Sequence, residues 1–430
     1  MTISVEERLA RAANVLDEHI EQYVVGVSYL AEGATPRRHR MKAGIVAAVA
    51  AVTLVLGVLL SSRGGGDGIV VAPTPASRPA GDEGWDLLPE APVSARFQHL
   101  SVSTGSGLLV WGGYGSDKAR TDGAFYDGET GTWRDVPKAP LAGDRGDAVG
   151  VWTGAEVIVI NGIDGHVKAA AFDPESLSWR SLPDPPLTNA ANMMTRVAAV
   201  GDAVVVIAVS VEGEGGARSE VARLDTTTDT WTIGQSPPAS FGSGFDAVAV
   251  GSDIVVIGRR GISGASCGES TVLAYRPGAN NWRNLPSGPI ANRGGLAVAS
   301  SGREVVVAGG IVCGDDSPRA ETFLLDPVTE SWRSAAPAPT AVRGSYRYGE
   351  AWTGRWMVAA NDDGAPLLYD PAANRWHVGP PNPLRGRYTE TAWTWVAGRV
   401  IIFSGGLADD EGGCCEPVDG GYAYTPPRDW

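Results

Sequence analysis

Five arginines recur at matching points of the sequence and could bind an anionic ligand. Each follows the last proline of a Pro-rich segment by four or five residues: Arg96, Arg145, Arg293, Arg343 and Arg387. The N–H groups of a guanidinium form a planar fork that matches the oxygens of carboxylates and sulfates. If the fold gathers these arginines around one axis, they form an interrupted ring that suits a carboxylate, a sulfate or a sugar acid.

The other reactive side chains form no catalytic or metal-binding pattern. Acidic clusters occur at Asp315-Asp316, Asp362-Asp363 and Asp409-Asp410-Glu411. A calcium site needs six or more converging oxygens, and no EF-hand spacing is present, so we expect these carboxylates to be solvated. His99, His166 and His377 stand at unrelated points, and no Gly-x-Ser-x-Gly elbow lies between a strand and a helix. The sequence therefore identifies no catalytic residue, no metal ligand and no cofactor.

Composition limits the partners and the fold class. The 430 residues include 35 basic and 49 acidic side chains, a net charge of −14, which argues against nucleic acid as a partner. The 57 glycines and 29 prolines, beside 43% hydrophobic residues, favour a turn-rich β-protein over a helical bundle or a disordered chain.

A repeat of 44 to 54 residues must position the arginines. The repeat is recognised by a tryptophan that recurs once per unit, at Trp85, Trp133, Trp179, Trp231, Trp282, Trp332, Trp376 and Trp430. Six of them follow by six residues Asp127, Asp173, Asp225, Arg276, Asp326 or Asp370, each of which comes after Tyr, Phe or Leu. This pattern predicts a strand, a tight turn and a strand that opens on Trp; a Pro-rich link and two β-branched runs follow. Four short strands in each of seven units predict an all-β, seven-bladed propeller whose tryptophans pack between blades.

The repeat resembles the kelch repeat, as in the central domain of galactose-oxidase-like proteins. The diglycine that usually ends the second kelch strand is present at Gly112-Gly113, Gly309-Gly310 and Gly405-Gly406, and it decays to Asn161-Gly162 and to a lone Gly258. The resemblance implies a kelch-like propeller. It also offers a second interpretation of the five arginines, because kelch-like repeats often carry an arginine there that bonds loop carbonyls. Galactose oxidases need a copper centre of two Tyr, two His and a cross-linked Cys, and no matching set occurs here, so oxidase activity does not follow.

The ends of the repeat predict how the ring closes. Trp85 opens an outer-strand signature that has no preceding strands, whereas the last unit, which ends near Trp430, lacks its outer strand. We therefore expect Trp85 to Pro89 to pair with the strand near Gly421 to Tyr424, which would leave no exposed sheet edge.

The four cysteines are predicted to form disulfides if the domain is exported. Cys267 and Cys313 fall in equivalent loops of consecutive blades, while Cys414 and Cys415 are adjacent. Four cysteines allow three connectivities, and we favour one bridge between the neighbouring blades and one vicinal bridge. A Cys-rich metal site is the alternative, although the spacing matches no zinc pattern.

The N-terminal region is predicted to be a membrane anchor. Residues 43–61 contain an uncharged apolar run that is long enough for a transmembrane helix, and Arg37, Arg38, Arg40 and Lys42 precede it. This charge bias predicts that residues 1–42, which carry a heptad-spaced amphipathic helix, lie in the cytosol. Residues 62–83 are typical of a Gly/Pro-rich linker, and residues 84–430 are expected to form the extracytoplasmic propeller. The arginine-rich, lysine-poor composition suggests a bacterial source.

Three functional hypotheses follow from this organisation. The first is a surface-displayed binding module that holds a protein or a glycan on its loop face without catalysis. The second is a carbohydrate-active propeller enzyme that lacks the copper site. The third is a transmembrane sensor that couples outside binding to the cytosolic helix.

Overall fold

The computed structural model describes residues 82–428 except 117, 142–147, 164–165, 189–192, 213–215, 240, 242–243, 260–269, 313–316, 343, 345–350, 362, 384–387, 390–391 and 408–415. Within this part of the chain, helical structure is limited to two 3₁₀ turns, η2 (Pro277–Ala279) and η3 (Gly288–Ile290). No helix among these residues is long and apolar enough to cross a membrane. The predicted cytosolic helix, membrane span and most of the linker lie outside the described residues and remain predictions.

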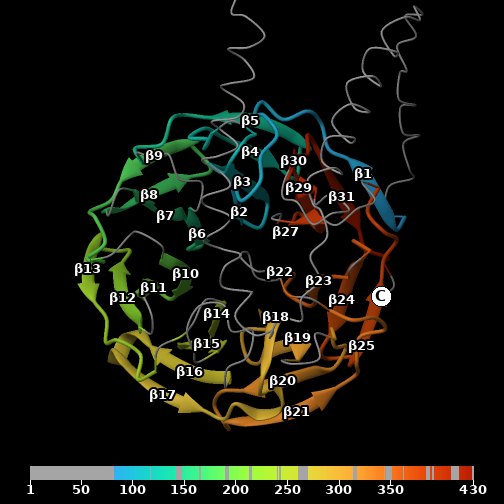
Figure 1. Cartoon of the computed structure of the whole chain (residues 1–430). Coiled ribbons are helices and arrows are strands. Elements are labelled where there is room, and N and C mark those ends of the chain that lie inside the picture. Colours follow the sequence, from blue (N-terminus) through green and yellow to red (C-terminus); the bar gives the residue numbers. More distant parts are fainter. Residues whose placement is uncertain are drawn as a thin grey trace, which may run out of the picture. The chain divides into compact units, whose positions relative to one another are not determined.

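Seven four-stranded antiparallel sheets surround a central axis and form the predicted seven-bladed propeller (Figure 1). Blade 1 contains β2 (Leu100–Ser103), β3 (Gly107–Trp111), β4 (Gly123–Asp127) and β5 (Thr132–Val136). Blade 2 contains β6 (Val149–Trp152), β7 (Val157–Ile163), β8 (His166–Asp173) and β9 (Ser178–Ser181). Blade 3 contains β10 (Met193–Val200), β11 (Ala203–Glu212), β12 (Gly216–Asp225) and β13 (Thr230–Ile233). Blade 4 contains β14 (Phe245–Val250), β15 (Asp253–Arg259), β16 (Ser270–Arg276) and β17 (Asn281–Leu285).

The remaining blades keep the same order, with the first strand nearest the axis. Blade 5 contains β18 (Arg293–Ser300), β19 (Val305–Val312), β20 (Thr322–Asp326) and β21 (Ser331–Ala335). Blade 6 contains β22 (Ala351–Trp352), β23 (Met357–Ala360), β24 (Pro366–Asp370) and β25 (Arg375–Val378). Blade 7 contains β27 (Trp393–Val396), β28 (Arg399–Phe403), β31 (Gly421–Thr425) and β1 (Gly84–Leu87). A small extra sheet joins β26 (Tyr388–Thr389), β29 (Gly406–Leu407) and β30 (Glu416–Pro417).

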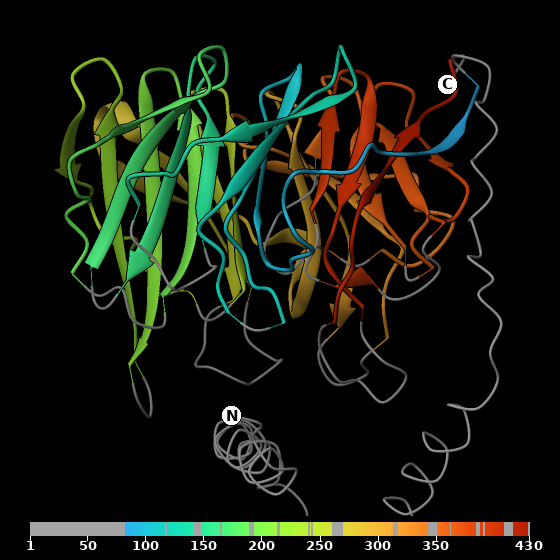
Figure 2. The same cartoon turned by 90° about the horizontal axis from the view of Figure 1, so that it is seen from above.

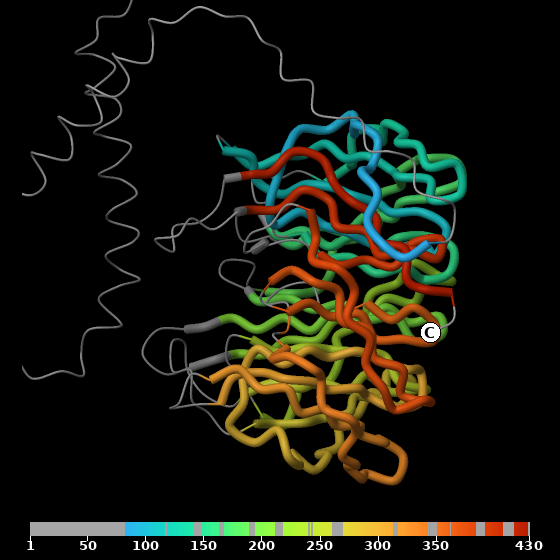
Figure 3. Tube along the Cα trace, turned by 90° about the vertical axis from the view of Figure 1, so that its right-hand side faces the viewer, coloured from blue at the N-terminus to red at the C-terminus, as the bar shows by residue number. Residues whose placement is uncertain are grey.

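The ring closes as the sequence predicts. Strand β1 pairs antiparallel with β31, in a register that places Trp85 opposite Tyr424. Figures 1 and 3 show this N-terminal strand, in blue, beside the red C-terminal strands. The Trp85 indole packs edge-on against Trp393 with 5.9 Å between ring centroids, and its N–H donates to the Pro380 carbonyl of blade 6 at 2.8 Å. The first strand of the propeller therefore completes the last blade and ties it to its neighbour.

The core consists of one hydrophobic cluster at each interface between neighbouring blades. Strand β7 shows why, because its side chains alternate between two interfaces. Val157 and Val159 pack toward blade 1, whereas Ile158 and Ile160 pack toward blade 3. A strand that is buried on both faces needs a continuous apolar run, and the second strands of the repeat have one.

The repeating tryptophans pack between blades, as expected. In six of the seven that the structure describes, the indole N–H donates to a backbone carbonyl in the link that leaves the preceding blade. The Trp332 bond to the Pro286 carbonyl is 2.8 Å long. Trp179 is the exception, since its buried indole nitrogen has no hydrogen-bond partner among the described residues. Each such bond links two blades at the rim of the ring.

The recurrent spacing of Asp before Trp forms the outer turn of each blade. The Asp127 carboxylate accepts hydrogen bonds of 3.0 Å from the backbone N–H groups of Glu129 and Thr130, and the aspartates of blades 2, 3, 5 and 6 accept equivalent bonds. Blade 4 has Arg276 at this position instead. Its guanidinium donates to the buried Asp253 carboxylate at 2.7 Å, and the turn is formed by η2.

Candidate functional site

The strands of every blade run between two unlike faces of the ring (Figure 2). The turn face carries the short turns from first to second strand and from third to fourth strand. The loop face carries the connections from second to third strand and the links from each blade to the next. Of the five arginines predicted to bind a ligand, the structure describes two: Arg96 lies in such a link, and Arg293 opens β18 at the end of one. A binding site is therefore expected on the loop face.

Arg96 is fully buried and braces the diglycine loop of blade 1. Its Nη1 donates to the Gly112 carbonyl at 3.0 Å and lies 3.1 Å from a carboxylate oxygen of Asp122. Gly112 has φ of 70° and Gly113 has φ of 87°, a left-handed conformation that favours glycine at both positions. Burial lowers the pKa of the Arg96 guanidinium, and the Asp122 hydrogen bond opposes this effect. At this position the geometry agrees with the loop-bracing interpretation.

Arg293 repeats the same arrangement in blade 5. Its Nη1 donates to the Gly309 carbonyl at 3.3 Å and lies 3.3 Å from the Glu321 carboxylate. The guanidinium carbon stands 5.5 Å from the centroid of the Phe323 ring. Gly309 and Glu321 correspond to Gly112 and Asp122 of blade 1, so an arginine, a diglycine and an acidic residue form a unit that occurs in two blades.

The other predicted site residues lie outside the described residues. These are Arg145, Arg343, Arg387, Cys267, Cys313, Cys414 and Cys415. Their roles as ligand-binding arginines and as disulfide cysteines stay predictions. The acidic clusters at 315–316 and 409–411 fall in the same category, as does residue 362.

The histidines belong to three different blades. His377, in β25, lies 2.7 Å from the Glu83 carboxylate, which also accepts a hydrogen bond of 2.7 Å from the Tyr424 hydroxyl. His166 opens β8, and its side chain is outside the described atoms. His99 is 1% exposed beside blade 7, and within the described part of the chain neither of its ring nitrogens has a hydrogen-bond partner. Burial and the nearby charge of Arg96 lower the pKa of His99 to about 3, so it is neutral at pH 7.

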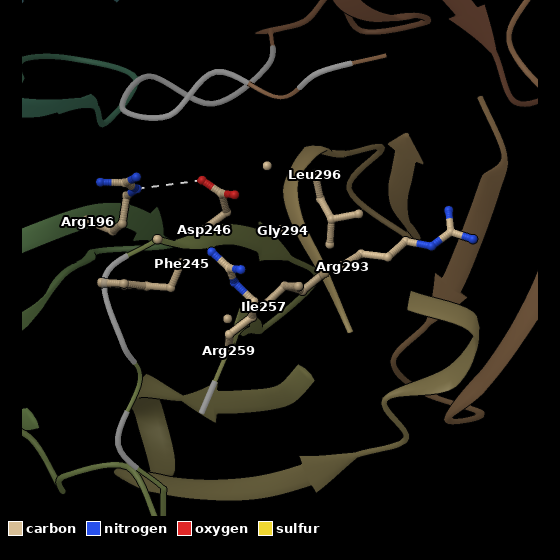
Figure 4. A pocket seen from close by; sticks show the side chains of 11 residues that line it. Arg196, Phe245, Asp246, Ile257, Arg259, Arg293, Gly294 and Leu296 are labelled. Atoms are coloured by element: carbon tan, nitrogen blue, oxygen red, sulfur yellow. Dashed lines mark ion pairs between the residues drawn. The ribbon is translucent and has the colours of Figure 1, made fainter. Parts of the chain in front are cut away.

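A small pocket opens on the loop face where blades 3, 4 and 5 meet (Figure 4). We call it the arginine pocket; it is lined by Arg196, Gly244, Phe245, Asp246, Ile257, Gly258, Arg259, Arg293, Gly294, Gly295 and Leu296. Its volume is about 40 Å³. The buried side chains of Phe245, Ile257 and Leu296 form an apolar floor.

An ion pair crosses the blade boundary at the edge of this pocket. Arg196 and Asp246 occupy equivalent positions on β10 and β14, and Arg196 Nε lies 3.6 Å from an Asp246 carboxylate oxygen. Their side chains are 12% and 19% exposed, respectively. Burial raises the pKa of Asp246, while the Arg196 charge acts in the opposite direction. The Arg196 guanidinium also stands over the Phe245 ring, 5.5 Å from its centroid.

Arg259 supplies the second guanidinium of the pocket. A Cβ built on Gly294 would lie 2.6 to 2.9 Å from Cζ, Nη1 and Nη2 of Arg259, so this guanidinium rests directly on the Gly294 backbone. Figure 4 shows Arg259 extending toward Asp246, whereas Arg293 extends away from both. Glycine at position 294 therefore creates the space that Arg259 occupies.

The sequence alone does not identify Arg196, Asp246 and Arg259 as pocket residues. For Arg259, however, the diglycine pattern of the repeat contains a signal. The β14–β15 register makes Gly258 equivalent to Gly309, so Arg259 stands where other blades have the second glycine. In the sequence this position resembles a decayed diglycine. In the structure it is a substitution that adds a charge at the loop face.

Residues 95–140 match the Kelch motif, and this range covers all four strands of blade 1. The match supports the kelch-like interpretation of the repeat. A search of curated proteins found no match to the chain.

Proposed function

We propose that the propeller is a binding module that holds a partner protein on its loop face without catalysis. Kelch propellers generally bind proteins. The observation that carries the proposal is the arginine pocket, which combines charged walls with a floor of apolar side chains. A pocket of about 40 Å³ accepts the tip of a side chain but not a whole small substrate. This size favours recognition of a protruding group on a larger partner.

Peptide selection tests the proposal. A displayed random-peptide library is selected against the full chain, and hydrogen exchange of backbone amides is measured with and without the selected peptides. We expect the selected peptides to slow amide exchange at the loop-face ends of β15 and β18, near Gly258 and Gly294. Protection confined to the turn face, near Gly302 and Gly354, would contradict a loop-face module.

Glycans are the other class of partner for this face. A glycan and peptidoglycan array, run beside turnover assays on the same ligands, compares protein binding, glycan binding and carbohydrate chemistry. Capture of a glycan without turnover would replace the protein partner by a glycan. Turnover would favour the carbohydrate-active enzyme, and the binding module without catalysis would then be wrong.

We further propose that the propeller is displayed outside the cytosol on a single-pass anchor. The apolar run within residues 43–61 and the basic residues before it support this topology. Protease added to intact cells should digest the propeller, and a variant without residues 43–61 should leave the membrane fraction. Thiol labelling without reductant should find no free cysteine. Recovery of four free thiols would remove the disulfide prediction and weaken the outside location.

A further inference from the structure

We propose that the arginine pocket is a carboxylate site that takes an acidic side chain of the partner. This inference rests on the proposed binding function and adds the chemistry of the group that is recognised. Two guanidinium groups, those of Arg196 and Arg259, border the pocket, and one carboxylate, that of Asp246, stands between neighbouring blades beside them. The walls therefore carry a net positive charge within a protein whose total charge is −14.

The apolar floor strengthens this local charge. Phe245, Ile257 and Leu296 are each less than 8% exposed, so little water reaches the base of the pocket. Electrostatic attraction is stronger beside such surfaces than in bulk water. An entering carboxylate would thus be held by charge-assisted N–H···O bonds, which are about twice as strong as neutral ones.

The volume of the pocket suits a small anionic group. One water-sized sphere occupies about 10 to 15 Å³ by the same measure. The pocket volume of about 40 Å³ is therefore that of about three such spheres, which is enough for the carboxylate tip of a side chain.

Arg293 has a different role from Arg196 and Arg259. It lines the pocket with its stem, but its guanidinium is directed to the Gly309 carbonyl and to Glu321. Glycine at position 294 leaves room for the Arg259 guanidinium beside Asp246. The pocket thus depends on one glycine and two arginines that belong to three blades.

The test titrates the full chain with N-acetyl-glutamate amide, and with N-acetyl-glutamine amide as the neutral comparison. We expect the glutamate probe to bind at least tenfold more tightly. Arg259→Ala should weaken its binding about tenfold, and Arg303→Ala, which removes an exposed charge from the turn face, should change it less than twofold. Equal affinity for both probes would overturn the inference.

Two further variants distinguish a site for the carboxylate from a site that binds the amide N–H groups of the probe. Gly294→Ala displaces the Arg259 guanidinium without removing its charge. It should therefore weaken binding of the glutamate probe as much as Arg259→Ala does. It also keeps the test valid if the Arg259→Ala variant fails to fold. Asp246→Asn removes the competing carboxylate and should strengthen binding several-fold. Weaker binding in Asp246→Asn would show that the probe is held through its N–H groups and would overturn the inference.

Two other probes identify the source of the anion. N-acetyl-alanine carries a terminal carboxylate, and tighter binding of this probe would support the site while assigning a chain terminus to it. Tighter binding of inorganic phosphate than of either carboxylate would overturn the assignment. If the glutamate probe fails while selected peptides still protect the loop face, this inference is wrong and the binding function stands.

Discussion

Replacement of His99 by leucine should make the propeller more resistant to mild acid. His99 is buried, stacks edge-on to Phe403 with 5.9 Å between centroids, and has no hydrogen-bond partner for either ring nitrogen among the residues that the structure describes. Leu296 occupies the equivalent position in blade 5, where it packs on the second glycine of the diglycine as His99 packs on Gly113. His99→Leu therefore places in blade 1 a side chain that another blade already accommodates.

The magnitude follows from the pKa of His99, which burial lowers from 6.5 to about 3. Well above pH 6.5 the residue is neutral in both the folded and the unfolded chain, so its titration there contributes almost nothing to the pH dependence of stability. As the pH falls from 6.5 toward 3, the unfolded chain binds a proton that the folded chain excludes, and stability is lost. At pH 5 this loss is roughly 2 kcal/mol, since each pKa unit corresponds to about 1.4 kcal/mol.

Urea unfolding of the two proteins at pH 7, 6 and 5 measures this difference. The variant should be more stable at pH 7 by about 1 to 3 kcal/mol, because two unpaired buried nitrogens are removed. Its advantage should grow by about 2 kcal/mol between pH 7 and pH 5. Carboxylates that titrate in the same range affect both proteins equally and cancel. An advantage that stays constant with pH would refute the buried, neutral state of His99.

Three further results are expected. Deletion of residues 84–90 removes the outer strand of blade 7 and should lower the melting temperature and promote self-association, because it exposes the edge of β31; a monomer of unchanged melting temperature would contradict ring closure by β1. In denaturant unfolding, Trp332→Phe should lower the free energy of unfolding by about 1 kcal/mol more than Trp179→Phe does. Of these two indoles, only that of Trp332 donates a hydrogen bond to a described residue of a neighbouring blade. Equal losses of stability would contradict a role for this hydrogen bond in joining the blades. Arg293→Ala with Arg343→Ala should lower the melting temperature, because Arg293 donates to the Gly309 carbonyl and pairs with Glu321. An unchanged melting temperature with weaker partner binding would favour the ligand-binding interpretation instead.

The architecture could be predicted from the sequence because its determinants are local and repeated. The turn aspartate accepts hydrogen bonds from backbone N–H groups only two and three residues ahead, as Asp127 does. The spacing from this aspartate to the tryptophan is therefore set within one hairpin. The alternating side chains of the second strands pack into two interfaces, which requires the continuous apolar runs seen in the sequence. Even the pairing of β1 with β31 followed from counting, because an orphan outer strand and an incomplete last blade complement each other.

Only the tertiary structure decided which charged side chains meet. Arg196 and Asp246 are 50 residues apart, and they form an ion pair because equivalent positions of adjacent first strands lie side by side around the axis. Arg96 and Arg293, two of the five arginines predicted to bind a ligand, turn instead toward loop carbonyls. The repeat places each residue within its blade. The orientation of a long side chain depends on which partners the neighbouring blades present, and a period along the chain does not contain that information.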